Sequence, residues 1–412
     1  MTKKVLYVTP PWYGFDKMIF DGAREVSGLP SFSYPLQKLV EDGCEVDCLL
    51  IRESTDNRVF NLKAKWLKKI NFFSVFYDSN LVSKLTGVYR IRRIVKVLIT
   101  RNDYDFVYLH GTTPAIVTDI VRRMGVPVAQ RLYGTFLWEQ IKKRGFYRAI
   151  LTRWFEFKAF TVKKEFLMVT NDGSGGDKVV EKIFRCRRPP FDFYHLYNGV
   201  RAFDETLSEN TNDDFGFLSD KPFLLCVGRF DAWKNQHLVV EILASLRQRG
   251  FDLNLLFIGP HDTLGDNYFK FVSSTVRDFK LTDRVFFLGH KSPEYIAYAA
   301  RKSLCVLSLN DVCNVTSVFH EMLSCGAALI VKKGEDVEKL ISHRVNGFLV
   351  NDVNDATDTV IELINSRELQ NRIRNNGKHL SQSYAMSWDD RARLECDLIY
   401  SVIDNCTKNS DI

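Results

Sequence analysis

The stretch PFLLCVGRFDAWKN, residues 222–235, joins a short apolar run to a turn that carries two cations. The run Pro222–Val227 is typical of a buried strand in a parallel sheet, and Gly228 ends it. Arg229 and Lys234 follow directly. Ligands of open parallel sheets bind outside the carboxyl ends of the strands. The stretch therefore predicts an α/β fold with a ligand site directly after this strand.

Short apolar runs alternate with helix-like segments on both sides of this stretch. The predicted strands are Val5–Thr9, Glu45–Ile51, Tyr104–His110, Val126–Gln130, Pro222–Val227, Leu253–Ile258, Arg284–Leu288, Leu304–Leu309 and Ala327–Val331. Helices are predicted to include Pro35–Glu41, Pro114–Met124 and Leu238–Arg249. Such alternation builds parallel sheets through right-handed crossovers. We predict two Rossmann-like, doubly wound α/β domains that face a central cleft.

The length of 412 residues is too great for one ordinary core and suits two. A polar stretch, Ala202–Asp220, marks the expected boundary between them. We predict an amino-terminal acceptor domain over residues 1–201, completed by residues from about 386 to 412, and a carboxyl-terminal donor domain over residues 202–385.

Composition indicates a folded cytoplasmic protein. The chain is 45% hydrophobic and 26% charged, and no stretch approaches the ~18 consecutive apolar residues of a membrane span. The apolar run after Lys4 is short and Pro10 ends it, which favours a first strand over a signal peptide. The nine cysteines are scattered without a C-x-x-C pair, so we expect reduced thiols rather than disulfides or a zinc site.

A basic, aromatic stretch runs from Arg58 to Arg101, with eleven Lys and Arg, seven aromatics and one acid, Asp78. Such a stretch can rest on an anionic membrane surface, here the inner face of the membrane. It can equally be a solvated helix face with a buried aromatic side. The sequence leaves these two open, and we expect no nucleic-acid partner.

Arg229 and Lys234 lie five residues apart on the predicted strand-to-helix turn. A nucleoside-diphosphate leaving group gains negative charge as the sugar bond breaks, and fixed cations stabilise that charge. The alternative is a pair of exposed loop cations without a ligand.

A second polar segment, residues 310–321, follows a predicted strand and leads into a helix. Backbone amides at a helix start, here around Thr316, Ser317 and Val318, form an anion site without any side-chain charge. Glu321 lies about one turn further on, where a carboxylate can accept hydrogen bonds from both ribose hydroxyls. A solvated helix residue is the alternative for Glu321.

The order of these segments resembles the donor half of the family 4 retaining glycosyltransferases, which have the two-domain GT-B fold. The resemblance is specific across roughly residues 221–350 and looser over the rest of the chain. The matching segments are Gly228-Arg229 with Lys234, Phe257-Ile258-Gly259, Val285–Gly289, Glu321-Met322, Cys325-Gly326-Ala327 and Asn346–Val350, with Asn198–Val200 and Ser387–Arg391 as looser matches. The resemblance implies that the last helices cross back to the amino-terminal domain.

The resemblance also implies residue roles. Arg229 and Lys234 would hold the donor diphosphate, the backbone of residues 316–318 would meet the distal phosphate, and Glu321 would bind the ribose.

One position departs from the family pattern. Members usually carry a second glutamate eight positions before the residue that matches Glu321, and this chain has Cys313 there. Asn314 is a candidate substitute ligand for a sugar hydroxyl, and Asp311 is a weaker one.

The amino-terminal half offers four further candidates. His110 ends a predicted strand and matches a histidine of many family members, so it would position the sugar; a structural histidine is the alternative. Gly28 falls where the family places a glycine loop close to the phosphates, and an ordinary turn is the alternative. Arg131 and Tyr133 follow the next strand and are candidate substrate contacts.

We predict an enzyme that transfers a hexose-type sugar from an NDP-sugar to a glycan or lipid-linked acceptor, as in cell-surface polysaccharide synthesis. His110, Arg229 and Lys234 are the predicted catalytic residues, and retention of configuration rests on the resemblance alone. No cofactor or metal is expected, since the sequence has neither D-x-D in a metal-binding context nor a histidine cluster with ligand spacing. The alternatives are a nucleotide-sugar epimerase or hydrolase on the same fold, and a non-enzymatic basic protein that binds membrane or nucleic acid.

Overall fold

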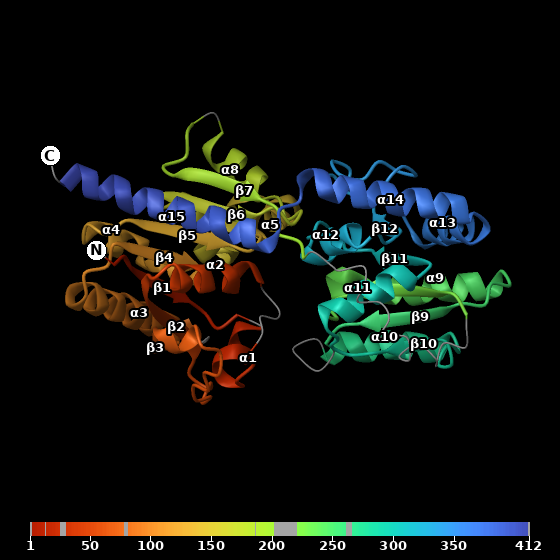
Figure 1. Cartoon of the computed structure of the whole chain (residues 1–412), viewed down its shortest axis with the longest axis horizontal. Coiled ribbons are helices and arrows are strands. Elements are labelled where there is room, and N and C mark those ends of the chain that lie inside the picture. The colour runs from red at the N-terminus through yellow and green to blue at the C-terminus, as the bar shows by residue number, and fades with distance from the viewer. Residues whose placement is uncertain are drawn as a thin grey trace. The chain divides into compact units, whose positions relative to one another are not determined.

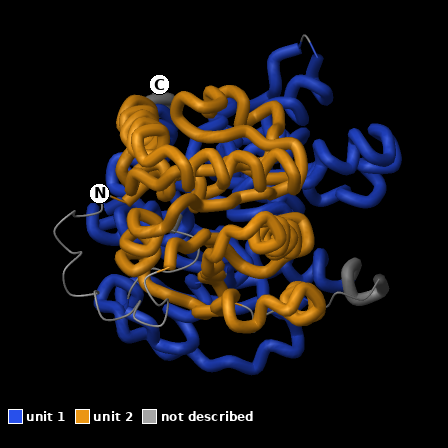
Figure 2. The backbone as a smooth tube through the Cα atoms, turned by 90° about the vertical axis from the view of Figure 1, so that its right-hand side faces the viewer, with its two compact units in different colours: residues 1–197, 388–412 blue, residues 198–387 orange. Residues whose placement is uncertain are grey.

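The computed structural model divides the chain into two compact units (Figure 2). The first unit holds residues 1–197 and 388–412, and the second holds residues 198–387. The residues that the structure describes are 2–12, 14–24, 30–77, 81–185, 187–201, 221–260 and 266–410. The predicted boundaries at 201/202 and 385/386 differ from these units by four residues and two residues (201 against 197, 385 against 387).

The first unit is built on a seven-stranded sheet in the order β3-β2-β1-β4-β5-β6-β7, with every pair parallel. Its strands are β1 (Lys4–Thr9), β2 (Glu45–Glu53), β3 (Ile70–Tyr77), β4 (Phe106–His110), β5 (Val128–Leu132), β6 (Phe166–Thr170) and β7 (Asp192–Leu196). The strands β4, β5 and β6 are buried along their whole length, as expected for parallel strands covered by helices on both faces.

Helices cover this sheet, and the last one comes from the carboxyl end of the chain. They are α1 (Phe15–Phe20), α2 (Pro30–Glu41), η1 (Leu67–Lys69), α3 (Leu81–Arg101), η2 (Thr113–Val117), α4 (Thr118–Arg123), α5 (Leu137–Arg144), α6 (Phe146–Thr152), α7 (Trp154–Thr161), α8 (Gly176–Phe184) and α15 (Trp388–Ser410). Figure 1 shows α15 lying beside α2, against which it packs. The predicted return of the last helix to the amino-terminal domain is confirmed.

The second unit repeats the plan with a six-stranded parallel sheet in the order β10-β9-β8-β11-β12-β13. Its strands are β8 (Phe223–Val227), β9 (Asn254–Ile258), β10 (Val285–Phe287), β11 (Cys305–Ser308), β12 (Leu329–Lys332) and β13 (Phe348–Val350). Its helices are η4 (Ala232–Lys234), α9 (Gln236–Gln248), α10 (Asp266–Asp278), α11 (Pro293–Lys302), α12 (Ser317–Ser324), α13 (Val353–Asn365) and α14 (Arg367–Tyr384). The predicted α/β class with two Rossmann-like domains is confirmed.

Four strands were not predicted: β3, β6, β7 and β13. The strand β3 is half-exposed and lies inside the basic stretch, and β7 is only partly buried. Both are edge strands of their sheet. Such strands lack the continuous apolar run that identifies a buried parallel strand.

The two places where the chain passes between the units lie side by side. The backbone N–H of Val200 donates to the carbonyl of Met386 at 2.9 Å, and Val200 forms a bridge with Ser387. The chain therefore leaves and re-enters the first unit through paired segments.

Two further observations concern the whole chain. The eight cysteines in the described ranges carry free thiols, and Cys186 lies outside those ranges. Within the part of the chain that the structure describes, no helix combines the length and apolar character needed to cross a membrane.

A buried charged cluster joins α15 to the first sheet. Glu395 accepts a hydrogen bond from the Tyr108 hydroxyl at 2.5 Å and one from Arg391 Nη1 at 3.0 Å. Arg131 Nε lies 3.6 Å from the same carboxylate. The side chains of Arg131, Arg391 and Glu395 are at most 3% exposed. One carboxylate thus balances two guanidinium groups in a region that excludes water.

Replacement of this carboxylate should destabilise the first unit. In Glu395→Gln two arginines stay buried without a counter-charge, and breaking a buried ion pair costs about 3–5 kcal/mol. Asp389→Asn is the matched control, because Asp389 lies on the same helix in an exposed pair with Arg393. We expect urea unfolding, followed by circular dichroism, to show a large loss for Glu395→Gln and little change for Asp389→Asn. Equal losses would contradict a special role for the buried cluster.

Candidate active site

The site of the second unit begins where three strands end in glycines. Gly228 follows β8, Gly259 follows β9, and Gly289 follows β10. The N–H of Gly228 donates to Ile258 at 2.8 Å, and the N–H of Gly259 donates to Gly289 at 2.9 Å. A Cβ on Gly259 would lie 2.1 Å from the carbonyl oxygen of Gly228, so no side chain fits between these strand ends.

The amine of Lys234 lies over this glycine turn. A Cβ on Gly228 would come within 2.6 Å of Lys234 Nζ, and the amine also lies 5.1 Å from the centre of the Trp233 ring. Burial lowers the pKa of Lys234, and the charge of Arg229 lowers it further. The absence of a side chain at Gly228 is what lets the cation reach the end of the strand.

Arg229 leaves the same turn but has a partner that was not predicted. Its Nε donates to Asp231 Oδ2 at 2.7 Å, and about half of the Arg229 side chain is exposed. Asp231 lies only two residues after Arg229, and this spacing of an acid and a base is the feature of the sequence that could have predicted the pair. An anion that binds Arg229 would compete with the Asp231 carboxylate.

Two hydrogen bonds join this turn to the loop after β11. Asn235 Nδ2 donates to the carbonyl of Leu309 at 2.9 Å, and the N–H of Asp311 donates to the carbonyl of Trp233 at 2.9 Å. Asn235 adopts a left-handed conformation (φ 56°), which turns the chain into α9. The two segments that the sequence singled out separately are therefore neighbours.

The loop after β11 carries Cys313 in a strained conformation. Cys313 is buried with φ 51°, and its carbonyl accepts a hydrogen bond from Asn310 Nδ2 at 3.3 Å. Asn314 is also buried, and its side-chain oxygen has no hydrogen-bond partner in the described part of the chain. A buried amide oxygen without a donor is costly, which makes it a candidate ligand for a hydroxyl group.

Asp311 and the helix start complete this loop. Asp311 forms a half-exposed pair with Lys332 at 2.5 Å, a cation at the end of β12 that was not predicted. Thr316 caps α12 by accepting from the N–H of Phe319, and Ser317 Oγ accepts from Asn198 Nδ2 at 2.9 Å. Amides of the first helical turn, including those of Ser317 and Val318, have no acceptor within their own helix.

Glu321 lies one turn into α12 and is partly buried. Burial raises the pKa of its carboxyl to about 7, although the nearby charge of Arg201 lowers it. Perturbed carboxyl groups of this kind gather at functional sites. The next helix residue before it, His320, is fully buried against Tyr384 and has a structural role.

Comparisons with known proteins show the class of protein to which this chain is similar. Residues 208–380 match the family model Glycosyl transferases group 1. An uncharacterized glycosyltransferase of Methanocaldococcus jannaschii is 24% identical over 351 residues, which are 79% of this chain and 88% of that protein. The alpha-D-kanosaminyltransferase of Streptomyces kanamyceticus is 24% identical over 65% of this chain and 69% of that protein. The chain carries a glycosyl transferases group 1 domain, and it is a glycosyltransferase.

Two solved structures share the fold of this glycosyltransferase. The sucrose-phosphate synthase of Thermosynechococcus elongatus has a TM-score of 0.76 with 14% identity, and the match covers 98% of this chain and 100% of that one. HepE of Anabaena, solved with UDP and glucose, has a TM-score of 0.66 with 14% identity, and the match covers 97% of this chain and 100% of that one. At such identities the likeness shows the fold alone, which is GT-B.

In the first unit of the glycosyltransferase, His110 ends β4 as predicted, but its ring is fully buried. Nδ1 lies 2.7 Å from the Tyr133 hydroxyl, and the ring stacks on Tyr7 at 4.5 Å. Burial holds the pKa of His110 well below its usual range, and the charge of Arg131 adds to this effect. Its Nε2 has no hydrogen-bond partner among the described residues. A role of this neutral imidazole in substrate orientation stays a prediction.

The other candidates of the first unit have different positions. Arg131 is fully buried with its guanidinium directed at Glu395 and 5.2 Å from the Tyr133 ring, so it lies in the core. The sequence makes Arg131 a candidate substrate contact because it follows the predicted strand Val126–Gln130. The carboxylate of Glu395 on α15 holds it inside instead. Tyr133 bonds to His110. Gly28 lies outside the described residues.

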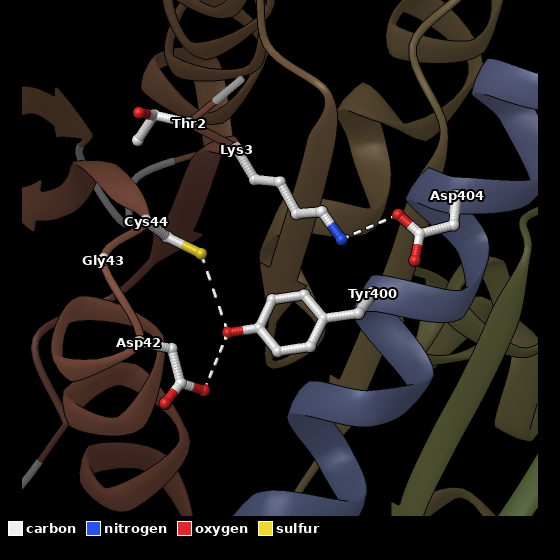
Figure 3. A pocket seen from close by; sticks show the side chains of 7 residues that line it. All are labelled: Thr2, Lys3, Asp42, Gly43, Cys44, Tyr400 and Asp404. Atoms are coloured by element: carbon white, nitrogen blue, oxygen red, sulfur yellow. Dashed lines mark hydrogen bonds and ion pairs between the residues drawn. The ribbon is translucent and has the colours of Figure 1, made fainter.

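A hollow of about 820 Å³ in the first unit is not part of this site (Figure 3). It is lined by Thr2, Lys3, Asp42, Gly43, Cys44, Tyr400 and Asp404. Lys3 pairs with Asp404 at 2.7 Å, and the Tyr400 hydroxyl donates to Asp42 at 3.0 Å. Apart from Tyr400 and Asp404 of α15, these residues precede β1 or β2, whereas ligands of parallel sheets bind at the carboxyl ends of the strands. The side chains in this hollow instead fasten α15 to the sheet.

Among the described residues, no group of three or more His, Cys, Asp or Glu side chains could hold a metal ion. That the enzyme needs no metal stays a prediction from the sequence.

Proposed function

We propose that the second unit binds the diphosphate of a nucleotide sugar at the turn after β8. The observation that carries this proposal is the position of the Lys234 amine over Gly228, beside the Arg229 turn. A preorganised ammonium group stabilises the charge that develops on a departing diphosphate. The first-turn amides of α12 supply a second anion contact. The hydrogen bonds of Asn235 and Asp311 hold the loop before α12 next to the turn after β8.

The sugar and ribose contacts follow from the same loop and helix. Glu321 accepts hydrogen bonds from the ribose hydroxyls, and Asn314 accepts one from a hydroxyl of the transferred sugar through its unpaired side-chain oxygen. Cys313 stands in place of the acid that the resemblance leads one to expect, so Asn314 takes over part of its role. HepE was solved with UDP and glucose, which favours a uridine nucleotide and a hexose as the donor.

The reaction proposed is transfer with retention, as in the family 4 glycosyltransferases that the donor half resembles. The bond between the sugar C1 and the diphosphate oxygen breaks, and a bond from C1 to the acceptor oxygen forms on the same face. The departing phosphate oxygen takes the acceptor proton, so no side-chain nucleophile is required. The acceptor is a glycan or a lipid-linked sugar in cell-surface polysaccharide synthesis, bound by the first unit on the cytoplasmic side of the membrane.

Nucleotide binding tests this function directly. A saturation-transfer NMR and calorimetry screen of UDP, GDP, ADP, CMP and their sugar conjugates should find one nucleotide that binds selectively. Arg229→Ala should weaken it by about 10- to 100-fold, since a hydrogen bond to a charged group contributes about 1.5–3 kcal/mol. Arg247→Ala, a half-exposed arginine on α9 outside the site, is the control and should bind normally. If no nucleotide bound, the proposed donor site would be wrong.

The glycine turn offers a second test with a matched control. Gly228→Ala places a Cβ where the Lys234 amine lies, and Gly250→Ala adds a Cβ in open space at another positive φ. Both substitutions carry backbone strain, but only the first displaces the cation. We expect similar thermal unfolding of the two variants and at least about tenfold weaker nucleotide binding for Gly228→Ala alone. Equal nucleotide affinities would show that the amine does not contact the ligand.

The pH dependence of binding tests the role of Glu321. Its pKa is raised to about 7, so its carboxyl is largely protonated below pH 7 and ionised above it. Ribose hydroxyls donate to the ionised form, and affinity should therefore rise with pH through about 7, by up to about tenfold for each unit below it. In Glu321→Gln calorimetry should find lower affinity without this step. If Glu321→Gln kept the full pH dependence of nucleotide affinity, the titrating group would be the nucleotide phosphate and not Glu321.

A further inference from the structure

The stretch 58–101, for which the sequence left a membrane surface and a solvated helix face open, has most of its aromatic side chains packed inward. Trp66 and Phe72 pack against the core that contains Tyr7, and Phe73 and Tyr77 pack against the core on the other face of the sheet. Phe76 is 41% exposed but lies 5.3 Å from the Arg52 guanidinium. The exposed side chains of α3 include Arg90, Arg93 and Lys96, together with two apolar ones, Tyr89 (64% exposed) and Val97 (38%).

A different segment of the first unit exposes large apolar side chains. The helices α5, α6 and α7 form the crossover between β5 and β6. Tyr147 is 82% exposed, Leu151 79%, Trp154 55% and Phe136 42%. Exposed large apolar groups are ordinary when scattered, but a continuous group of them indicates an interaction surface.

These side chains form one surface rather than separate points. Tyr147 and Leu151 stand four residues apart on α6, so they share a face of that helix. The Tyr147 ring contacts Phe146, Phe146 contacts Phe157, and Phe157 contacts Trp154, with centroids 5.8, 6.4 and 6.1 Å apart. A chain of rings therefore connects the exposed Tyr147 of α6 to the exposed Trp154 of α7 through Phe146 and Phe157, which pack against the core beneath.

The same segment is positively charged, with six cations and two acids between residues 136 and 158. Glu139 pairs with Lys142 and Lys143 at 2.9 and 3.0 Å. Glu156 is buried, where it accepts from Thr135 Oγ1 and the N–H of Phe136. The surface thus shows cations to solvent while its acids are engaged or buried.

Arg144 and Arg148 are the exposed cations closest in sequence to Tyr147. They have no acidic partner within the described part of the chain. Arg153 lies 5.4 Å from the Phe136 ring, so it also belongs to this surface.

We propose that α5–α7 dock the glycosyltransferase on an anionic bilayer surface, with Tyr147, Leu151 and Trp154 at the level of the headgroups. Arg144 and Arg148 would meet the lipid phosphates. Aromatic and leucine side chains beside cations are the composition of an interfacial membrane contact, and each cation near the surface adds to the attraction. Nucleic-acid bases stack on aromatic rings, which Leu151 lacks. A second copy of this chain would bring a second positive patch, and the two would repel each other. A bilayer is therefore favoured over nucleic acid or a second chain.

Vesicle flotation of the full-length protein tests the proposal. We expect binding to vesicles that contain phosphatidylglycerol, weak binding to pure phosphatidylcholine, and weaker binding at high salt. Arg144→Ala with Arg148→Ala should lower the partition coefficient by about 30-fold, on about 1 kcal/mol for each cation. Tyr147→Ser with Leu151→Ser and Trp154→Ser should lower it by more than about tenfold.

Matched variants separate this surface from the others. Arg90→Ala with Arg93→Ala removes two exposed cations from α3, and Phe271→Ser with Phe279→Ser removes two exposed rings from the second unit. We expect both pairs to bind vesicles as the unchanged protein does. Loss of binding in the α3 pair alone would return the membrane surface to residues 58–101 and overturn the proposal.

Other outcomes also overturn it, and the proposed donor site is tested separately. Absence of vesicle binding at low salt, or a dimer in sedimentation that the triple serine variant disrupts, would assign the surface to another role. The docking surface is independent of the proposed donor site, and the two can be tested apart. Arg229→Ala should weaken nucleotide binding and leave vesicle binding unchanged. The α5–α7 variants should bind nucleotide normally and bind vesicles more weakly.

Discussion

The close approach of two strand ends determines the geometry of the second unit. The carbonyl of Gly228 stands where a Cβ of Gly259 would be, so the turn after β9 must lack a side chain. Because the turn after β8 is bare, the Lys234 amine can fold back over it. The same turn then leads through Asn235, whose hydrogen bond to Leu309 fixes the loop after β11. Because β8 and β11 are parallel, both polar segments lie at the same end of the sheet, and this hydrogen bond joins them.

The charges of the two units are arranged in opposite ways. In the second unit the Arg229 and Lys332 cations form pairs with Asp231 and Asp311 that stay partly exposed. Partly exposed pairs contribute little to stability, so an arriving anion can replace the carboxylate at small cost. In the first unit the pair between Arg391 and Glu395 is buried, and it is a permanent part of the core.

Much of the fold and part of the site could be predicted from patterns along the chain. Buried parallel strands such as β1, β8 and β9 read as continuous apolar runs, and Gly228 directly follows one of them. The edge strand β3 was missed because its half-exposed residues give no such run. The partners Asp231 and Lys332 were missed because a side-chain pair depends on geometry that residue type does not record.

By itself the sequence determined the α/β class, the two-domain plan and the segments that carry polar groups after strands. These properties follow from local periodicity, which each segment expresses without reference to distant parts of the chain. Only the tertiary structure decided that His110 and Arg131 are buried. The His110 ring packs against Tyr7 and Phe32, and Arg131 faces Glu395, which α15 brings from the far end of the chain. It also decided that Phe72, Phe73 and Tyr77 of β3 pack against the cores, while Tyr147 of α6 and Trp154 of α7 are exposed. Exposure depends on what packs against a side chain, and that is a property of contacts between segments far apart in sequence.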